Sequence, residues 1–409
     1  MNPLFKNDVF VPDGEAHVWE DGRIYVYGSW DIMGDDNYCS DVYHVFSSDD
    51  MEVWTDHGVC FSSKQMAWVP EGTRLYAPDC AYKDGVYYLY YCIPDGRCGV
   101  AKSLSPTGPF TDVGEIRDVL GIDPAVLMDD DGQAYLYWGQ FDNVRVAKLK
   151  DNMTEIMPET MEKPLSVKEH EFHEGSSVKK INGKYYFLFT DTHRHGGRAT
   201  SLGYAVSDHP MHGFVYQGII IDNFGCDPKT WNNHGSMAEF HGQWYIFYHR
   251  STHASFFSRH ICAEPIEIKA DGTIPEVKMT TAQRANASIP MQACRACMLY
   301  GNVRIAGNQA SKHTLALTEI AVGDSAVYRY MDFDGEDHVC LRLKADGAGR
   351  MELYIDDFYH DSVIFSQTDD YIDVEKDILP LTGKHTLVWR FFGEFQKASM
   401  DAFCFSKKG

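Results

Sequence analysis

The stretch Ile122-Asp123-Pro124-Ala125-Val126-Leu127, followed by Asp130-Asp131-Gly132-Gln133-Ala134-Tyr135-Leu136-Tyr137, contains a pattern that occurs five times in this chain. A polar residue precedes an apolar run, a turn with glycine follows, and an aromatic strand comes next. The turn glycines are 63, 47, 51 and 59 residues apart, at Gly22, Gly85, Gly132, Gly183 and Gly242. This period is close to the roughly 40–50 residues that four short strands of a propeller blade need. The repeat therefore predicts a five-bladed β-propeller.

Each repeat has a polar residue where its apolar run begins. These residues stand nine, six, nine, nine and eight positions before their glycines and are Asp13, Asp79, Asp123, Glu174 and His234. If every apolar run is the innermost strand of a blade, the five side chains lie at one strand end and converge on the central axis. The sequence thus predicts a ring of carboxylates at one mouth of the propeller.

Composition excludes several classes of function. The 409 residues include 37 basic and 59 acidic side chains, and a net charge of -22 argues against binding to a nucleic-acid backbone. The first residues have no apolar core of a signal peptide, and no run of 18 apolar residues occurs, so we expect a cytoplasmic protein without a membrane partner. Eleven cysteines, most of them in strand-like runs, are typical of reduced core thiols. No motif for an organic cofactor is found, and the oligomeric state cannot be predicted.

A second pattern begins near Ala293. Alternating runs such as 338–343, 350–355 and 385–391 are separated by Gly and Asp turns, which is typical of a β-sandwich of roughly 115 residues. Helical periodicity is nearly absent from the whole chain. We therefore predict an all-β protein with a propeller over residues 1–285 and a jelly-roll sandwich over residues 293–409.

The blade motifs resemble those of glycoside hydrolase family 43, in that family's order and spacing. The matching segments are Phe10–Val18, Tyr76–Asp79, Ile122–Ala125, His173–Ser176 and His234–Arg250. The segments 381–387 and 400–403 resemble the closing strands of a family 6 carbohydrate-binding sandwich. The resemblance implies an inverting hydrolase that releases arabinofuranose or xylose from small plant-derived oligosaccharides. A non-catalytic sugar-binding propeller, a retaining propeller enzyme, or a glycosidase for another furanose such as galactofuranose is the alternative.

The resemblance also implies roles for three acids: Asp13 as general base, Glu174 as general acid, and Asp123 as the residue that tunes and orients the acid. Inversion needs a base and an acid about 6.5–9.5 Å apart, with water between them. A third carboxylate beside the acid raises its pKa by like-charge repulsion. In the family an Asp-Pro pair often opens the first motif, but here Pro12 precedes Asp13 and Glu15 follows. Glu15 therefore competes for the role of base, and strand parity cannot separate the two.

The remaining predicted site residues bind sugar or a cation. Trp30 and Asp31 open a long polar and aromatic loop, Asp79 belongs to the ring, and Arg250 ends the fifth aromatic strand. We predict that these four contact the substrate. Trp68, Trp138 and Trp231 are further candidates for stacking on a sugar ring. By resemblance, His234 lies near a bound cation, most simply calcium, on the propeller axis.

Overall fold

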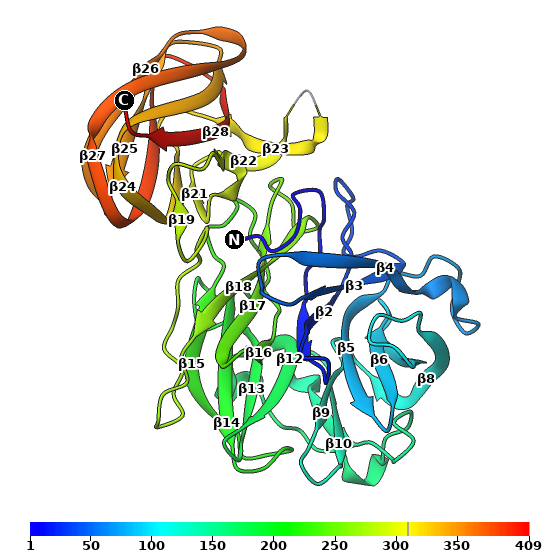
Figure 1. Ribbon diagram of the computed structural model, residues 1–409. Coiled ribbons are helices and arrows are strands. Elements are labelled where there is room, and N and C mark those ends of the chain that lie inside the picture. The colour runs from blue at the N-terminus through cyan, green and yellow to red at the C-terminus, as the bar shows by residue number, and fades with distance from the viewer. Residues whose placement is uncertain (309–310, 409) are drawn as a thin grey trace.

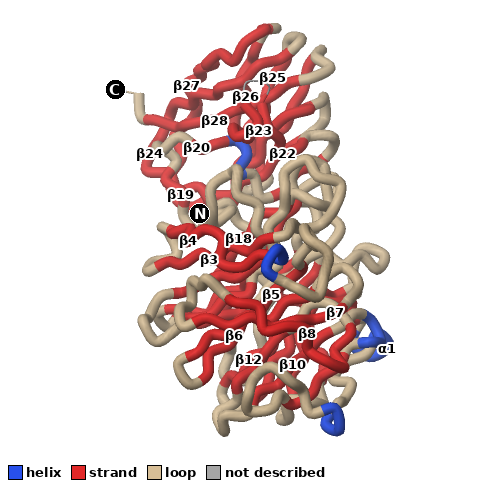
Figure 2. Tube along the Cα trace, turned by 90° about the vertical axis from the view of Figure 1, so that its right-hand side faces the viewer, coloured by secondary structure: helices blue, strands red, loops and turns tan. Residues whose placement is uncertain are grey.

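The computed structural model describes residues 1–308 and 311–408, and it divides the chain into a propeller and a C-terminal domain (Figure 1). Strands dominate both domains, and the single short α-helix, α1 (Val167–His170), lies at the edge of the propeller (Figure 2). Four 3₁₀ helices, Ser63–Gln65, Phe141–Asn143, Pro158–Thr160 and Ala293–Arg295, complete the helical content of the described residues. In this part of the chain, no helix has the length and hydropathy needed to cross a membrane. The predicted all-β class is confirmed.

Five antiparallel sheets form the blades, as predicted. The first contains β1 (Glu15–Val18), β2 (Ile24–Gly28), β3 (Val42–Ser48) and β4 (Trp54–Ser62), and the second β5 (Tyr76–Lys83), β6 (Val86–Cys92), β7 (Arg97–Ser103) and β8 (Thr111–Leu120). The third contains β9 (Ala125–Met128), β10 (Ala134–Trp138) and β11 (Arg145–Lys148), and the fourth β12 (Phe172–Ile181), β13 (Lys184–Asp191), β14 (Ser201–Ser207) and β15 (Val215–Asp222). The fifth contains β16 (Met237–Phe240), β17 (Gln243–Ser251) and β18 (Arg259–Ile266). Blades three and five thus have three strands rather than the four that a full blade contains.

The five turn glycines adopt nearly one conformation. Gly22, Gly85, Gly132, Gly183 and Gly242 have φ values of 79, 82, 82, 79 and 79°. A Cβ atom on any of them would meet no neighbour within 4 Å, so the left-handed backbone and not crowding explains the glycine. The sequence repeat is therefore a repeat of one turn between the first two strands of every blade.

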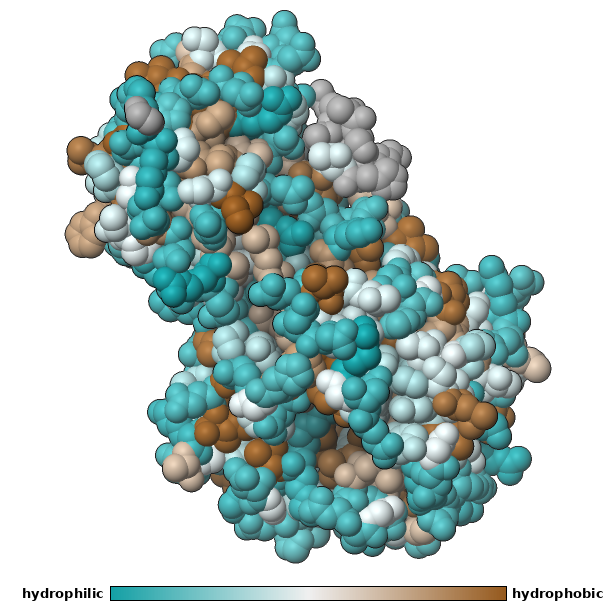
Figure 3. Space-filling model, in the orientation of Figure 1, coloured by the Kyte–Doolittle hydropathy of each residue, from teal (hydrophilic) through white to brown (hydrophobic). Residues whose placement is uncertain are grey.

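The N-terminal segment joins the last blade to the first. The amide of Leu4 donates to the carbonyl of Ile261 at 3.0 Å, and the amide of Asn2 donates to that of Thr281 at 2.8 Å. The Asn2 side chain also donates to Glu264 at 3.0 Å. These contacts place the segment beside β18 and hold the ring closed. Hydrophilic side chains cover most of the face in Figure 3, where the propeller is hollowed near its centre.

The C-terminal domain is one ten-stranded sheet around its own hydrophobic core. Its strands are β19 (Ala285–Asn286), β20 (Met291–Gln292), β21 (Met298–Tyr300), β22 (Arg304–Asn308), β23 (Ser311–Ile320), β24 (Ser325–Ala345), β25 (Gly349–Ile355), β26 (Phe358–Phe365), β27 (Thr368–Gly393) and β28 (Ala398–Ser406). Its first strand begins at Ala285, ahead of the predicted start at 293. The hydrogen-bonded sheet is continuous because β24 and β27, with 21 and 26 residues, extend through the whole domain. The jelly-roll sandwich and its family 6 resemblance stay predictions.

A shared hydrophobic cluster joins the two domains. Ile246 and Tyr248 of blade five belong to the same buried cluster as Val327, Val388 and Cys297 of the C-terminal domain. The burial of apolar surface on both sides favours a fixed junction.

All eleven cysteines are free, and nine of them are buried, which agrees with the expected reduced thiols.

Candidate active site

A pocket of about 280 Å³ lies where the inner strands of the blades begin. Four of the five predicted ring residues line it: Asp13, Asp123, Glu174 and His234. Other residues that line the pocket include Tyr38, Gln140, His173, Trp231 and Arg259. The predicted convergence of acids from separate repeats therefore occurs in the folded chain.

Two of the acids share an unusual backbone conformation. Asp13 and Asp123 lie two residues before β1 and β9, and both have a φ of 57°. A left-handed conformation is uncommon for residues other than glycine and is concentrated at functional sites. Because both residues have the same φ at the same offset from an inner strand, blades one and three present their carboxylates in equivalent ways.

Glu174 reaches the pocket from a bulge in β12. The pairing of β12 with β13 changes register on both sides of Glu174, and Gly175 has a φ of 74°. A Cβ atom on Gly175 would lie 2.7 Å from Thr190 Oγ1 and 3.3 Å from the ring of His234. Glycine is thus favoured both by the backbone angle and by the close approach of Thr190 Oγ1.

Asp13 is held as a carboxylate. It is 6% exposed, and Arg259 Nη1 lies 3.0 Å from its Oδ1 while Ser29 Oγ donates to its Oδ2 at 2.8 Å. Burial raises the pKa of Asp13, but the charge of Arg259, with the hydrogen bond from His249, outweighs burial and holds that pKa far below its usual value. Asp13 therefore stays ionised at any pH at which the protein would work.

Asp123 has the opposite character. Its Oδ2 accepts the amide hydrogen of Gly175 at 3.1 Å and lies 3.8 Å from His234 Nδ1. Burial, followed by the negative charges of Glu174 and Asp13, raises the pKa of Asp123 well above its usual value. Asp123 thus keeps a proton at a pH where an isolated carboxyl has lost it.

Glu174 is oriented by an amide side chain. Gln140 Nε2 donates to Glu174 Oε2 at 2.5 Å, and His173 Nε2 lies 3.9 Å from the same oxygen. The Glu174 side chain is 12% exposed, more than those of Asp13 and Asp123. Of the three acids it is therefore the one most open to the mouth of the pocket.

Arg259 was not predicted from the sequence, and Asp31 explains its position. Arg259 Nε and Nη2 each lie 2.9 Å from an oxygen of Asp31, and both side chains are almost fully buried. Asp31 was predicted to contact substrate, but its carboxylate is used to hold Arg259 against Asp13. The available signal was an arginine at the start of the apolar strand β18, since a buried guanidinium needs an anionic partner.

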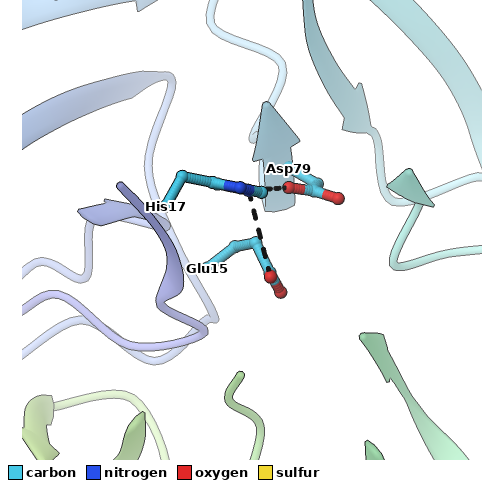
Figure 4. Close-up of side chains that lie close together, drawn as sticks. All are labelled: Glu15, His17 and Asp79. Atoms are coloured by element: carbon cyan, nitrogen blue, oxygen red, sulfur yellow. Dashed lines mark hydrogen bonds and ion pairs between the residues drawn. The ribbon is translucent and has the colours of Figure 1, made fainter. Parts of the chain in front are cut away.

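Asp79 and Glu15 belong to a second, separate cluster. Their carboxylates and the His17 ring point toward one another (Figure 4), with His17 Nε2 2.7 Å from Asp79 Oδ1 and 3.9 Å from Glu15 Oε1. Lys179 Nζ lies 2.6 Å from Glu15 Oε1. Burial raises the pKa of Asp79 to about 6 and lowers that of His17 to about 3. Neither Glu15 nor Asp79 lines the pocket, and Asp79 Oδ2 instead accepts the amide of Val126 at 2.6 Å.

Trp30 and Arg250, the other predicted substrate contacts, also have internal partners. Trp30 stacks on His44 with ring centroids 3.9 Å apart. Arg250 Nη2 donates to the carbonyl of Thr280 at 2.7 Å and lies 3.4 Å from Glu264 Oε1, so it anchors the segment leading to the second domain. Of the four predicted stacking tryptophans, Trp231 lines the pocket and is 43% exposed.

The surroundings of His234 fit a hydrated cation better than one held by protein groups alone. Burial lowers the pKa of His234, so the imidazole is neutral and able to bind a metal. The nearest carboxylate oxygens, on Asp13 and Asp123, lie 4.0 and 3.8 Å from its Nδ1. Among the described residues, only Glu15, His17 and Asp79 are close enough together to share an ion, and Glu15 of that group already pairs with the Lys179 ammonium.

The fold and the pocket define a class of protein: a five-bladed propeller whose axial pocket brings together three acidic side chains, and hydrolysis of a glycosidic bond uses such carboxyl groups. The chain belongs to glycosyl hydrolases family 43, whose model matches residues 2–274. It is therefore a glycoside hydrolase.

Three known proteins illustrate the relationship. A xylosidase/arabinosidase of Thermoclostridium stercorarium is 34% identical over 335 residues, which cover 71% of this chain and 69% of that protein. A β-xylosidase/α-arabinofuranosidase from a compost metagenome, solved with xylotriose in a calcium-free form, is 31% identical with a TM-score of 0.60 and covers 68% of this chain and 97% of its own. An arabinoxylan arabinofuranohydrolase of Bacillus subtilis, solved with cellotetraose, covers 100% of this chain and 97% of its own with a TM-score of 0.57; at 24% identity it shows a similar fold.

Proposed function

We propose that this protein is an inverting glycoside hydrolase that releases arabinofuranose or xylose from small plant-derived oligosaccharides. The observation that carries the proposal is the convergence of three acids on one pocket: Asp13, paired with Arg259, faces the same cavity as Asp123 and Glu174. The relatives are named as xylosidases and arabinosidases, which supports a pentose as the sugar that is released. The cytoplasmic location expected from the sequence is part of the proposal.

Asp13 is the general base. Arg259 and Ser29 each occupy one side of its carboxylate, which leaves lone pairs free to accept a proton from water. Glu15, the competing candidate, is paired with Lys179 and Ser177 and does not line the pocket. Asp13 thus removes a proton from the water molecule that attacks the anomeric carbon.

Glu174 is the general acid, and Asp123 supports it. Because Gln140 donates to Oε2 of Glu174, the acidic proton belongs on Oε1, the oxygen that meets the glycosidic oxygen of the substrate. The negative charge of Glu174 helps to raise the pKa of Asp123, so the two carboxyls interact electrostatically. In the proposed mechanism Glu174 gives its proton to the oxygen of the departing sugar.

Stereochemistry tests the proposal directly. Asp13 and Glu174 come from blades one and four, which are not adjacent, and this separation favours a water molecule between them over covalent attack by Asp13. We expect NMR at early times of hydrolysis to show a first-formed sugar with the opposite anomeric configuration to the substrate, and no methyl glycoside in added methanol. A retained product or transfer to methanol would contradict the mechanism. A panel of 4-nitrophenyl pentosides and a galactofuranoside identifies the sugar.

A calcium ion near the axis is a second part of the proposal. His234 would contact the hydrated ion through its neutral imidazole, water would supply the oxygen ligands that calcium prefers, and the ion would add positive charge to the pocket. We expect calcium added to chelated enzyme to raise the Tm, because a ligand that binds only the folded state stabilises it by about 2.7 kcal/mol at a hundred times its Kd. His234→Ala should abolish this rise. An unchanged Tm of the wild-type protein would remove calcium from the proposal.

A further inference from the structure

A second cavity adjoins the pocket and is not used by the chemistry described above. This outer groove, of about 510 Å³, is lined by residues of blades two and three, among them Asp118, Leu120, Trp138, Asn143 and Arg145. It shares Pro94, Ile122 and Gln140 with the walls of the pocket. The two cavities therefore adjoin at these three residues.

The chemistry of the reaction fixes which part of the substrate can enter the outer groove. A general acid protonates the oxygen of the leaving group, so the leaving group extends from the bond on the acid's side. Gln140, whose side chain contacts Glu174, is also a wall of the outer groove. The groove thus has one wall, Gln140, in direct contact with the acid.

The lining of the outer groove suits a neutral saccharide. Ile122, the strongly exposed Leu120 and Met161 offer apolar surface to the C–H face of a sugar ring. Among the described residues, the hydrogen bonds of the Arg145 guanidinium use only Nη1, which donates to the carbonyls of Asp142 and Val144. Its Nε and Nη2 groups remain for hydroxyls, as do the exposed side chains of Asp118 and Asn143. An apolar wall with a few polar groups is the usual composition of a small-molecule site.

We propose that the outer groove binds the leaving-group saccharide and that Gln140 links its occupancy to the general acid. Gln140 precedes the 3₁₀ helix Phe141–Asn143, so it lies on the same loop as Asn143 and five residues before Arg145. A saccharide held by these two residues fixes the loop, and with it the amide that orients Glu174. This inference rests on the proposed role of Glu174 and assigns Gln140 as a positioning residue.

The test compares substrates that differ in their leaving group. For the pentose that the wild-type enzyme releases, kcat/KM is measured on the 4-nitrophenyl glycoside and on a trisaccharide. Arg145→Ala should lower the ratio of trisaccharide to aryl glycoside about tenfold. Arg117→Ala, an exposed arginine of β8 outside both cavities, is the matched control and should leave the ratio unchanged. An unchanged ratio in Arg145→Ala overturns the inference while leaving the proposed function intact.

Two further measurements separate positioning from binding. Gln140→Ala should lower kcat on the trisaccharide at least tenfold with little change in KM, since the sugar is still held while Glu174 loses its orientation. An equal loss on both substrates would contradict the link.

Xylotriose titrated into Glu174→Gln and into Glu174→Gln/Arg145→Ala should show a Kd about tenfold higher in the double variant. Equal Kd values would overturn the groove assignment, whether or not the wild type cleaves pentosides.

Discussion

Glu174→Gln is expected to lower kcat about 10²–10⁴-fold on an oligosaccharide, and much less on a 4-nitrophenyl glycoside, because nitrophenolate departs without a proton. The substitution keeps the size of the side chain and the contact with Gln140, but it removes the transferable proton. Steady-state kinetics on the two substrates measure the difference. Equal losses on both would show that Glu174 is not the general acid.

Substitution of the base should give the contrasting result. Asp13→Asn should abolish turnover of both substrates, since activation of water is needed however good the leaving group is. Glu15→Gln is the matched control because Glu15 lies two residues after Asp13, at the start of β1, and is paired with Lys179 outside the pocket. Loss of activity in a folded Glu15→Gln, with Asp13→Asn active, would reverse the assignment of the base.

The removal of Arg259 is expected to have the second largest effect. Without the guanidinium, the pKa of Asp13 should rise by about one to three units, the range typical of an Asp beside an Arg. Because Asp13 stays ionised in the wild type, protonation of the base should not limit its kcat/KM, whereas the kcat/KM of Arg259→Met should fall, as the pH is lowered, at a higher pH than that of the wild type. A profile that does not move would mean that another group sets its acidic limb.

Arg259 also contributes to the stability of the fold. The direction in which this contribution changes with pH follows from the lowered pKa of Asp13. The stabilising pair is fully present above the pKa of Asp in the unfolded chain, about 3.9, and is lost only as the pH falls toward the native value. At neutral pH, Arg259→Met leaves two buried carboxylates unpaired, so unfolding in urea should show a loss of about 3–5 kcal/mol. Asp31→Asn combined with Arg259→Met removes one of these charges and should recover part of the loss. If the double variant is no more stable than Arg259→Met, the loss of stability in Arg259→Met does not come from the unpaired Asp31.

The sequence by itself determined the number of blades and the chain positions of the pocket acids. Both depend on the repeated turn, whose glycines need a left-handed backbone wherever they occur in the chain. Asp13, Asp123 and Glu174 share a nine-residue distance from their glycines, and all three line the pocket. Asp79 stands at six, three residues further along its strand, which corresponds to about 10 Å at 3.3 Å per residue. That offset was visible in the sequence and accounts for its place in the separate cluster with Glu15.

Only the tertiary structure decided which partner each charged side chain has. Arg250 and Arg259 both lie on apolar strands of blade five, yet one anchors the segment before the second domain and the other holds Asp13. Gln140, Asp31 and Lys179 have their roles through contacts between residues more than thirty positions apart. Strand periodicity predicts the direction of a side chain but not what meets it there. That depends on how strands and blades pack around the axis, because a buried charge is stable only where a counter-charge meets it.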